Sequence, residues 1–193
     1  SQGGLLVKMQ VIDTGDRLWN AVSREPLSEL KLEPATRDLL QRGLFVKPLP
    51  EVTRVVFICT PQRGSFVAGR TLIANLVRRL LDFPKTFTGL TADLARNANA
   101  SVSPFVPTAV DNMSPRSPFI QGIQNIPVVP SVKAHSIIAV EGDGPVEEGD
   151  DGVVKYSSAH IEPVESELVV KSSHSGQGNP HAIEEVGRIL RLH

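Results

Sequence analysis

The chain has 193 residues, of which 40% are hydrophobic and 5% aromatic, and its formal net charge at pH 7 is −1. This length suits one globular domain, and the balanced charge excludes the basic excess typical of nucleic-acid-binding proteins. No apolar run approaches the roughly 18 residues of a transmembrane helix. A single cysteine excludes an internal disulfide. The scarcity of aromatic residues argues against a carbohydrate-binding platform.

The first four residues, Ser1 to Gly4, have a pattern typical of the second half of a nucleophile elbow. In such an elbow a serine lies on a sharp strand-to-helix turn, and small residues after it let the helix pack closely. Gly3 and Gly4 are expected to provide that room. The apolar residues that follow predict a helix over residues 2–13, buried against a sheet. The ordinary alternative is a disordered, glycine-containing terminus.

The next segments alternate between predicted helices and strands. Residues 15–50 predict an amphipathic segment that covers the site or the side of the sheet. It is expected to contain a helix that begins at Pro34 and ends at Gly43. Residues 54–59 predict a strand, and Cys59 is expected to be a small buried side chain within it. Apolar spacing then predicts a helix over residues 66–82, which Pro84 ends.

Residues 83–130 are rich in Pro, Ser, Asn and Thr and predict an irregular segment. Long segments of this kind in compact domains are usually lids, binding loops or disordered regions. Their large apolar side chains are expected either to line an acyl-binding pocket or to anchor the segment to the core. These side chains are Phe83, Phe87, Leu90, Leu94, Phe105, Val106, Met113, Phe119 and Ile120.

The last third of the chain contains two further predicted strands, residues 135–140 and 167–171. An acidic turn follows the first and His174 follows the second, so both are expected at the carboxyl edge of a parallel sheet, where ligands bind. The order Ser, Asp, His is that of serine hydrolases built on an α/β sheet. Asn179 and Pro180 predict the start of a final helix. Its expected apolar stripe consists of Ile183, Val186, Ile189 and Leu190.

Four stretches together resemble the α/β-hydrolase family, in particular its bacterial lipase-like and esterase-like members: Ser1-Gln2-Gly3-Gly4, Thr60-Pro61-Gln62-Arg63-Gly64-Ser65, Asp151-Gly152-Val153-Val154, and His174. Such relatives often carry His where this chain has Gln62. The resemblance implies that residues 1–193 form one α/β domain that corresponds to the carboxyl-terminal half of the family fold. It has a parallel sheet flanked by helices and lid or cap segments at 15–50 and 83–130. The upstream half is expected to complete the sheet beside the strand at 53–59, which would otherwise have an unpaired edge.

The resemblance implies a serine esterase or lipase that acts on small acyl esters or lipids, with no cofactor and no metal. Ser1 would be the nucleophile, His174 the base and Asp151 the acid that orients it, with the Gln2 N–H as one oxyanion-hole donor. The second donor would come from upstream, and activity is expected to depend on that segment. Asp150 stays open as the alternative acid. The compartment, cytoplasmic or exported, also stays open.

Several alternatives accompany this interpretation. His135, His160 and His181 are expected to have core or surface roles, and the acidic loop 141–151 is either solvated or a calcium site. Arg63 and Ser65 are expected to touch substrate or, for Ser65, to cap the following helix. Two other function classes fit the chain: an amino-terminal-nucleophile hydrolase that uses the Ser1 amine as its base, and a noncatalytic interaction fragment on a hydrolase scaffold.

Overall fold

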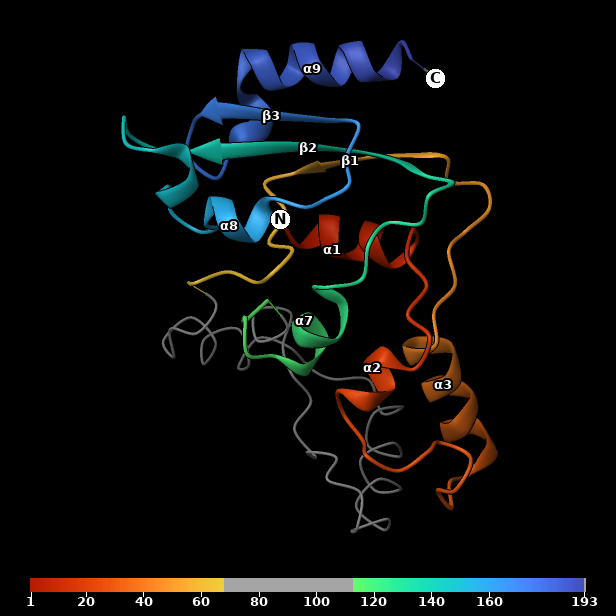
Figure 1. The fold of residues 1–193 in the computed structure, drawn as a ribbon. Coiled ribbons are helices and arrows are strands. Elements are labelled where there is room, and N and C mark those ends of the chain that lie inside the picture. Colours follow the sequence, from red (N-terminus) through yellow and green to blue (C-terminus); the bar gives the residue numbers. More distant parts are fainter. Residues whose placement is uncertain (68–112, 193) are drawn as a thin grey trace.

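A three-stranded parallel sheet forms the centre of the computed structural model, which describes residues 1–67 and 113–192 (Figure 1). Its strands are β1 (Arg54–Ile58), β2 (Lys133–Val140) and β3 (Ser166–Lys171), in the spatial order β1-β2-β3. In register, Ile58 pairs with Ile137 and Ile137 with Leu168. The three predicted strands and the α/β class are therefore confirmed. Cys59 lies just beyond β1 rather than within it.

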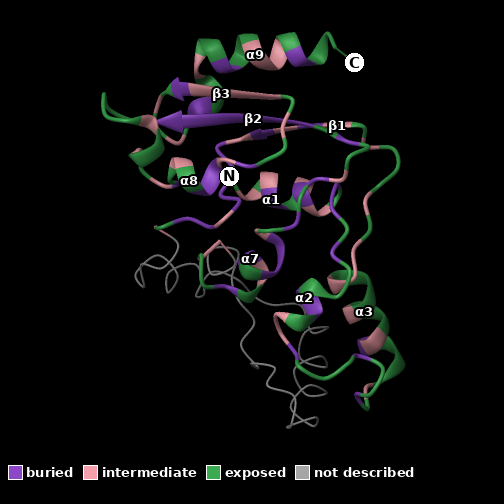
Figure 2. Ribbon diagram, viewed as in Figure 1, coloured by how far each residue is buried: buried purple, intermediate pink, exposed green. Residues whose placement is uncertain are grey.

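Helices cover both faces of this sheet, as is usual for parallel strands. Figure 1 shows α9 (Pro180–Leu190) on one face, and α1 (Gln2–Met9) and α8 (Tyr156–Ala159) on the other. Successive β1 side chains alternate between the two layers: Val55 and Phe57 pack with Val11 after α1, whereas Val56 packs in the α9 layer. Every residue of β2 after Lys133 is buried (Figure 2). This burial on two faces explains the long apolar run in β2.

Three short helices lie beyond the α1 layer: α2 (Arg17–Asn20), α3 (Pro34–Leu44) and α7 (Pro118–Ile123). The α7 helix corrects the expectation of an irregular segment up to residue 130. It forms because the Ser117 hydroxyl accepts a hydrogen bond from the Ile120 N–H and Pro118 occupies the first turn. Ile120 is fully buried against Leu5 and therefore serves as a core anchor. The other acyl-pocket candidates between residues 83 and 106, and the helix predicted at 66–82 from residue 68 onward, lie outside the described residues.

The structure corrects three helix boundaries or faces. Helix α1 ends at Met9 because the carbonyl oxygens of Gln10 and Val11 accept hydrogen bonds from the Leu49 and Val129 N–H groups instead of continuing the helix. Gly43 lies inside α3, which ends at Leu44. In α9, Asn179 caps the first turn as predicted, but its buried face differs from the predicted stripe.

That buried face of α9 is formed by Ala182, Val186 and Ile189, whereas Ile183 and Leu190 are 58% and 67% exposed. Two 3-10 turns, η1 (Val146–Glu148) and η2 (Gly176–Gly178), complete the described elements. No helix among the described residues is long and apolar enough to cross a membrane.

Candidate active site

Asp151 and His174 meet beyond the carboxyl ends of β2 and β3. The His174 Nδ1 atom lies 2.8 Å from the Asp151 Oδ2 atom. The Asp151 side chain is 1% exposed and that of His174 is 26% exposed. The two residues are 23 positions apart in sequence, so the parallel arrangement of β2 and β3 brings them together.

A tight turn holds the Asp151 carboxylate in place. Its Oδ1 atom accepts hydrogen bonds from the Val153 and Val154 N–H groups at 3.0 and 2.7 Å. Gly152, between Asp151 and Val153, has a φ of 85°, which favours glycine. The neighbouring Asp150 instead accepts from the Gly152 N–H at 2.8 Å. Asp151 is therefore the residue of this pair that contacts a histidine.

The hydrogen bond to Asp151 determines the tautomer of His174. An ionised carboxylate only accepts hydrogen bonds, so Nδ1 must donate to it. In the neutral ring the Nε2 atom then carries the free lone pair. His174 can accordingly act as a base through Nε2 while its other nitrogen stays fixed.

Close packing of α1 against Thr60 places Ser1 at the same edge of the sheet. A Cβ atom on Gly4 would lie 2.0 Å from Thr60 Oγ1, whereas one on Gly3 would meet nothing within 4 Å. The Ser1 nitrogen lies 3.4 Å from the carbonyl oxygen of Ile58, the last residue of β1. Gly4 therefore provides the close approach expected of both glycines, and Gly3 does not.

The Ser1 hydroxyl makes no capping hydrogen bond and lies 4.0 Å from Met113 Sδ. No hydrogen bond joins it to His174 within the described part of the chain. Helix α1 begins at Gln2, so the Gln2 N–H has no partner inside the helix and is available as a donor. Desolvation lowers the pKa of the Ser1 amine, and the electrostatic interactions with Cys59 and Asp151 act in the opposite direction. The Ser1 amine is therefore close enough to Asp151 for the two groups to interact electrostatically.

The segment from Thr60 to Ser65 contacts the turn that holds Asp151. Ser65 is buried, and its hydroxyl donates to the Val153 carbonyl oxygen at 2.7 Å. Arg63 donates to the carbonyl oxygens of Ser157 and His160. The positioning role of Ser65 had no signal in the sequence, because it depends on a partner 88 positions away.

Gln62 is fully buried, and among the described residues neither its Nε2 nor its Oε1 atom has a hydrogen-bond partner. A buried amide without hydrogen-bond partners normally lowers the stability of the folded protein.

Cys59 is also buried, with a φ of 47° that is uncommon outside glycine. Burial, and then the Asp151 charge, raise the pKa of its thiol. The neutral thiol packs against Gly176, in the loop that carries His174.

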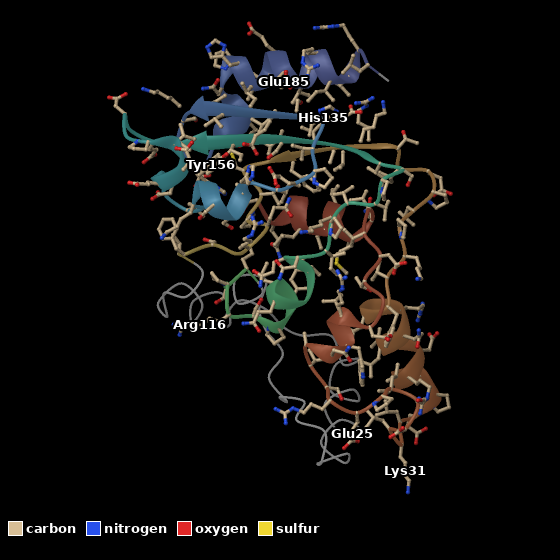
Figure 3. The ribbon with its side chains drawn as sticks, viewed as in Figure 1. Glu25, Lys31, Arg116, His135, Tyr156 and Glu185 are labelled. Atoms are coloured by element: carbon tan, nitrogen blue, oxygen red, sulfur yellow. The ribbon has the colours of Figure 1, made fainter. Side chains whose placement is uncertain are left out.

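Two other histidines lie in separate polar clusters. His135, labelled with Glu185 in Figure 3, is buried and connects Arg54 on β1 to Ser166 on β3, which in turn donates to Glu185 on α9. Burial, followed by the Arg54 charge, lowers the pKa of His135. This cluster joins α9 to the sheet, and of the two roles expected for His135, core or surface, the structure shows the core role.

His160 follows α8, and its Nδ1 atom lies 2.7 Å from Glu167 Oε2. Tyr156, labelled in Figure 3, stacks on the His160 ring and donates to Glu167. Burial and this hydrogen bond raise the pKa of Tyr156 to about 12. His181 is exposed in the first turn of α9. His193 lies outside the described residues.

In the acidic loop, Asp143 pairs with Lys171 across the end of the sheet. Within residues 1–67 and 113–192, no group of three or more His, Cys, Asp or Glu side chains is arranged to hold a metal ion.

Comparisons of the chain with protein-family models, curated proteins and solved structures find no match.

Proposed function

We propose that this chain carries the Ser-Asp-His triad of an α/β-hydrolase and cleaves carboxylic acyl esters, in the manner of an esterase or lipase. The observation that carries the proposal is the hydrogen bond between His174 Nδ1 and the buried Asp151 carboxylate. The start of α1 at the same sheet edge supports it, because it brings Ser1 toward these two residues.

In the proposed reaction, the Ser1 hydroxyl turns from Met113 toward His174 and attacks the ester carbonyl carbon. His174 Nε2 accepts the serine proton during attack, and Asp151 stabilises the imidazolium that forms. The same proton then passes to the leaving alcohol as the acyl-enzyme forms. Water repeats the sequence and releases the acid. The Gln2 N–H donates to the developing oxyanion, and a second donor is assigned to upstream residues.

The proposed substrate is an acyl ester or lipid. Met113 supports an apolar acyl group, since its thioether lies 4.0 Å from the Ser1 hydroxyl oxygen. Methionine is a flexible apolar side chain that adapts to such groups.

A fluorophosphonate probe, followed by intact-mass and peptide mass spectrometry, tests the proposal. We expect one adduct, on Ser1, that is lost in the Ser1→Ala and His174→Ala variants. Asp151→Asn is expected to slow labelling by about 100-fold or more, since the corresponding change in serine proteases costs about 10⁴-fold. Asp150→Asn is the matched control and should label normally.

The other outcomes reject the proposal or identify a different mechanism. An adduct that forms without His174 would refute the triad. Acetylation of the Ser1 amine that abolishes labelling would identify an amino-terminal-nucleophile mechanism instead. Absence of labelling, both here and in a chain extended by its native upstream residues, would establish a noncatalytic interaction fragment.

A further inference from the structure

A pocket of about 200 Å³ lies on the α1 side of the sheet, lined in part by Lys8 on α1 and by Arg63 in the loop after β1. Asn125 and Glu162 contribute further polar groups to its wall. Ser1, Asp151 and His174 do not line it, so its occupancy is a separate question from ester hydrolysis.

Lys8 is 1% exposed. Within residues 1–67 and 113–192, its ammonium group has neither a hydrogen-bond acceptor nor a carboxylate partner. The acid on the pocket wall, Glu162, has a side chain that is 82% exposed, and its carboxylate lies 3.8 Å from His160 Nε2. Burial of a charge without a partner is costly, so charged side chains in proteins are usually paired. Lys8 thus lacks the counter-charge that its burial calls for.

Arg63 adds a second positive charge with a fixed position. Its NH1 group donates to the carbonyl oxygens of Ser157 and His160, which hold the guanidinium at the pocket. A guanidinium has five N–H donors, so others remain for a ligand. Because carbonyl oxygens do not neutralise its charge, the pocket contains two cations.

We propose that Lys8 and Arg63 form a binding site for a small phosphate-class oxyanion. Phosphate carries up to two negative charges, which match the two cations, and its oxygens accept charge-assisted hydrogen bonds from ammonium and guanidinium groups. A water molecule occupies about 30 Å³, so the pocket holds a group of roughly six non-hydrogen atoms. This corresponds to a phosphate ion or the phosphate end of a monoester.

Phosphorus-31 NMR titration of the whole chain with inorganic phosphate tests the site, at constant ionic strength maintained with chloride. We expect saturable shifts with the wild type, and affinity at least about tenfold weaker with Lys8→Met, since a hydrogen bond to a charged group is lost. Lys8→Arg keeps the charge and should retain most of the binding. Lys171→Met removes an exposed lysine that is paired with Asp143 and serves as the matched control.

Parallel titrations with ethyl phosphate distinguish a monoester from free phosphate: tighter binding of ethyl phosphate would identify the monoester as the ligand. The proposal is overturned if wild-type protein produces no saturable shift, or if Lys8→Met binds as tightly as Lys171→Met. Circular dichroism of each variant shows whether it is folded, and Lys8→Arg provides a second measure if Lys8→Met is not.

Discussion

Replacing the buried Lys8 with methionine should stabilise the protein. Burial, and to a lesser extent the Arg63 charge, lowers the pKa of Lys8 from 10.5 to about 8. One pKa unit corresponds to about 1.4 kcal/mol, so the charged amine is less favourable in the folded than in the unfolded chain by about 3 kcal/mol. Methionine keeps most of the apolar stem and has no charge. We expect a gain of about 1 to 3 kcal/mol at pH 7.

The same difference predicts how stability changes with pH. Below pH 8 the amine is charged in both states, and the full cost is present. Between pH 8 and 10.5 the unfolded chain binds the proton and the folded chain does not, so wild-type stability rises with pH toward that of Lys8→Met. Tyr156, whose pKa is raised to about 12, acts in the opposite direction above pH 10. Its contribution is shared by both proteins and cancels in their difference.

Urea denaturation of both proteins at intervals from pH 7 to 10, in buffer without phosphate, measures this difference in unfolding free energy. The difference should be largest at pH 7 and shrink as the pH rises. A destabilised Lys8→Met variant, or a difference that stays constant across this range, would refute the conclusion that Lys8 is an unpaired buried cation.

Three further predictions concern packing and burial. Gly4→Ala should lose about 1 to 2 kcal/mol, because the new methyl group would meet Thr60, whereas Gly3→Ala should gain a few tenths through helix propensity. Gln62→Met should gain about 1 kcal/mol by removing an unsatisfied buried amide. The wild type should lose more stability between pH 6.5 and 5 than His135→Gln, because the unfolded chain protonates a histidine whose folded pKa is lowered. Urea denaturation measures all three.

Each of these has a clear contrary result. Equal effects of alanine at positions 3 and 4 would contradict the close contact of α1 with Thr60. A destabilised Gln62→Met variant would show that the amide is hydrogen-bonded in the protein. Parallel acid profiles for the wild type and His135→Gln would show that His135 is not held neutral by its surroundings.

Several local features could be predicted from the sequence because neighbouring residues produce them. Asn179 and Pro180 start α9 through a side-chain cap and a preset backbone angle. The apolar runs in β1, β2 and β3 predict strands of a parallel sheet, and the structure confirms them. The order of Ser1, Asp151 and His174, each next to a predicted strand or helix, indicated the residues that lie at one sheet edge.

Other features depended on residues far away in the sequence. Periodicity predicted Ile183 and Leu190 on the buried face of α9, but the sheet contacts Ala182, because a helix with two apolar arcs can turn either toward a neighbour. The helix predicted through residue 13 ends at Met9, since the N–H groups of Leu49 and Val129 bind the carbonyl oxygens of Gln10 and Val11.

The sequence by itself determined the strands, the last helix and the order of the candidate triad, because short-range hydrophobic patterns and caps specify them. Only the tertiary structure decided that Asp151 rather than Asp150 meets His174, and that Lys8 is buried without a described partner beside Arg63. The physical reason is that burial and charge pairing depend on which surfaces meet. In the sequence Lys8 is an ordinary helical lysine, and only the fold places it against a pocket.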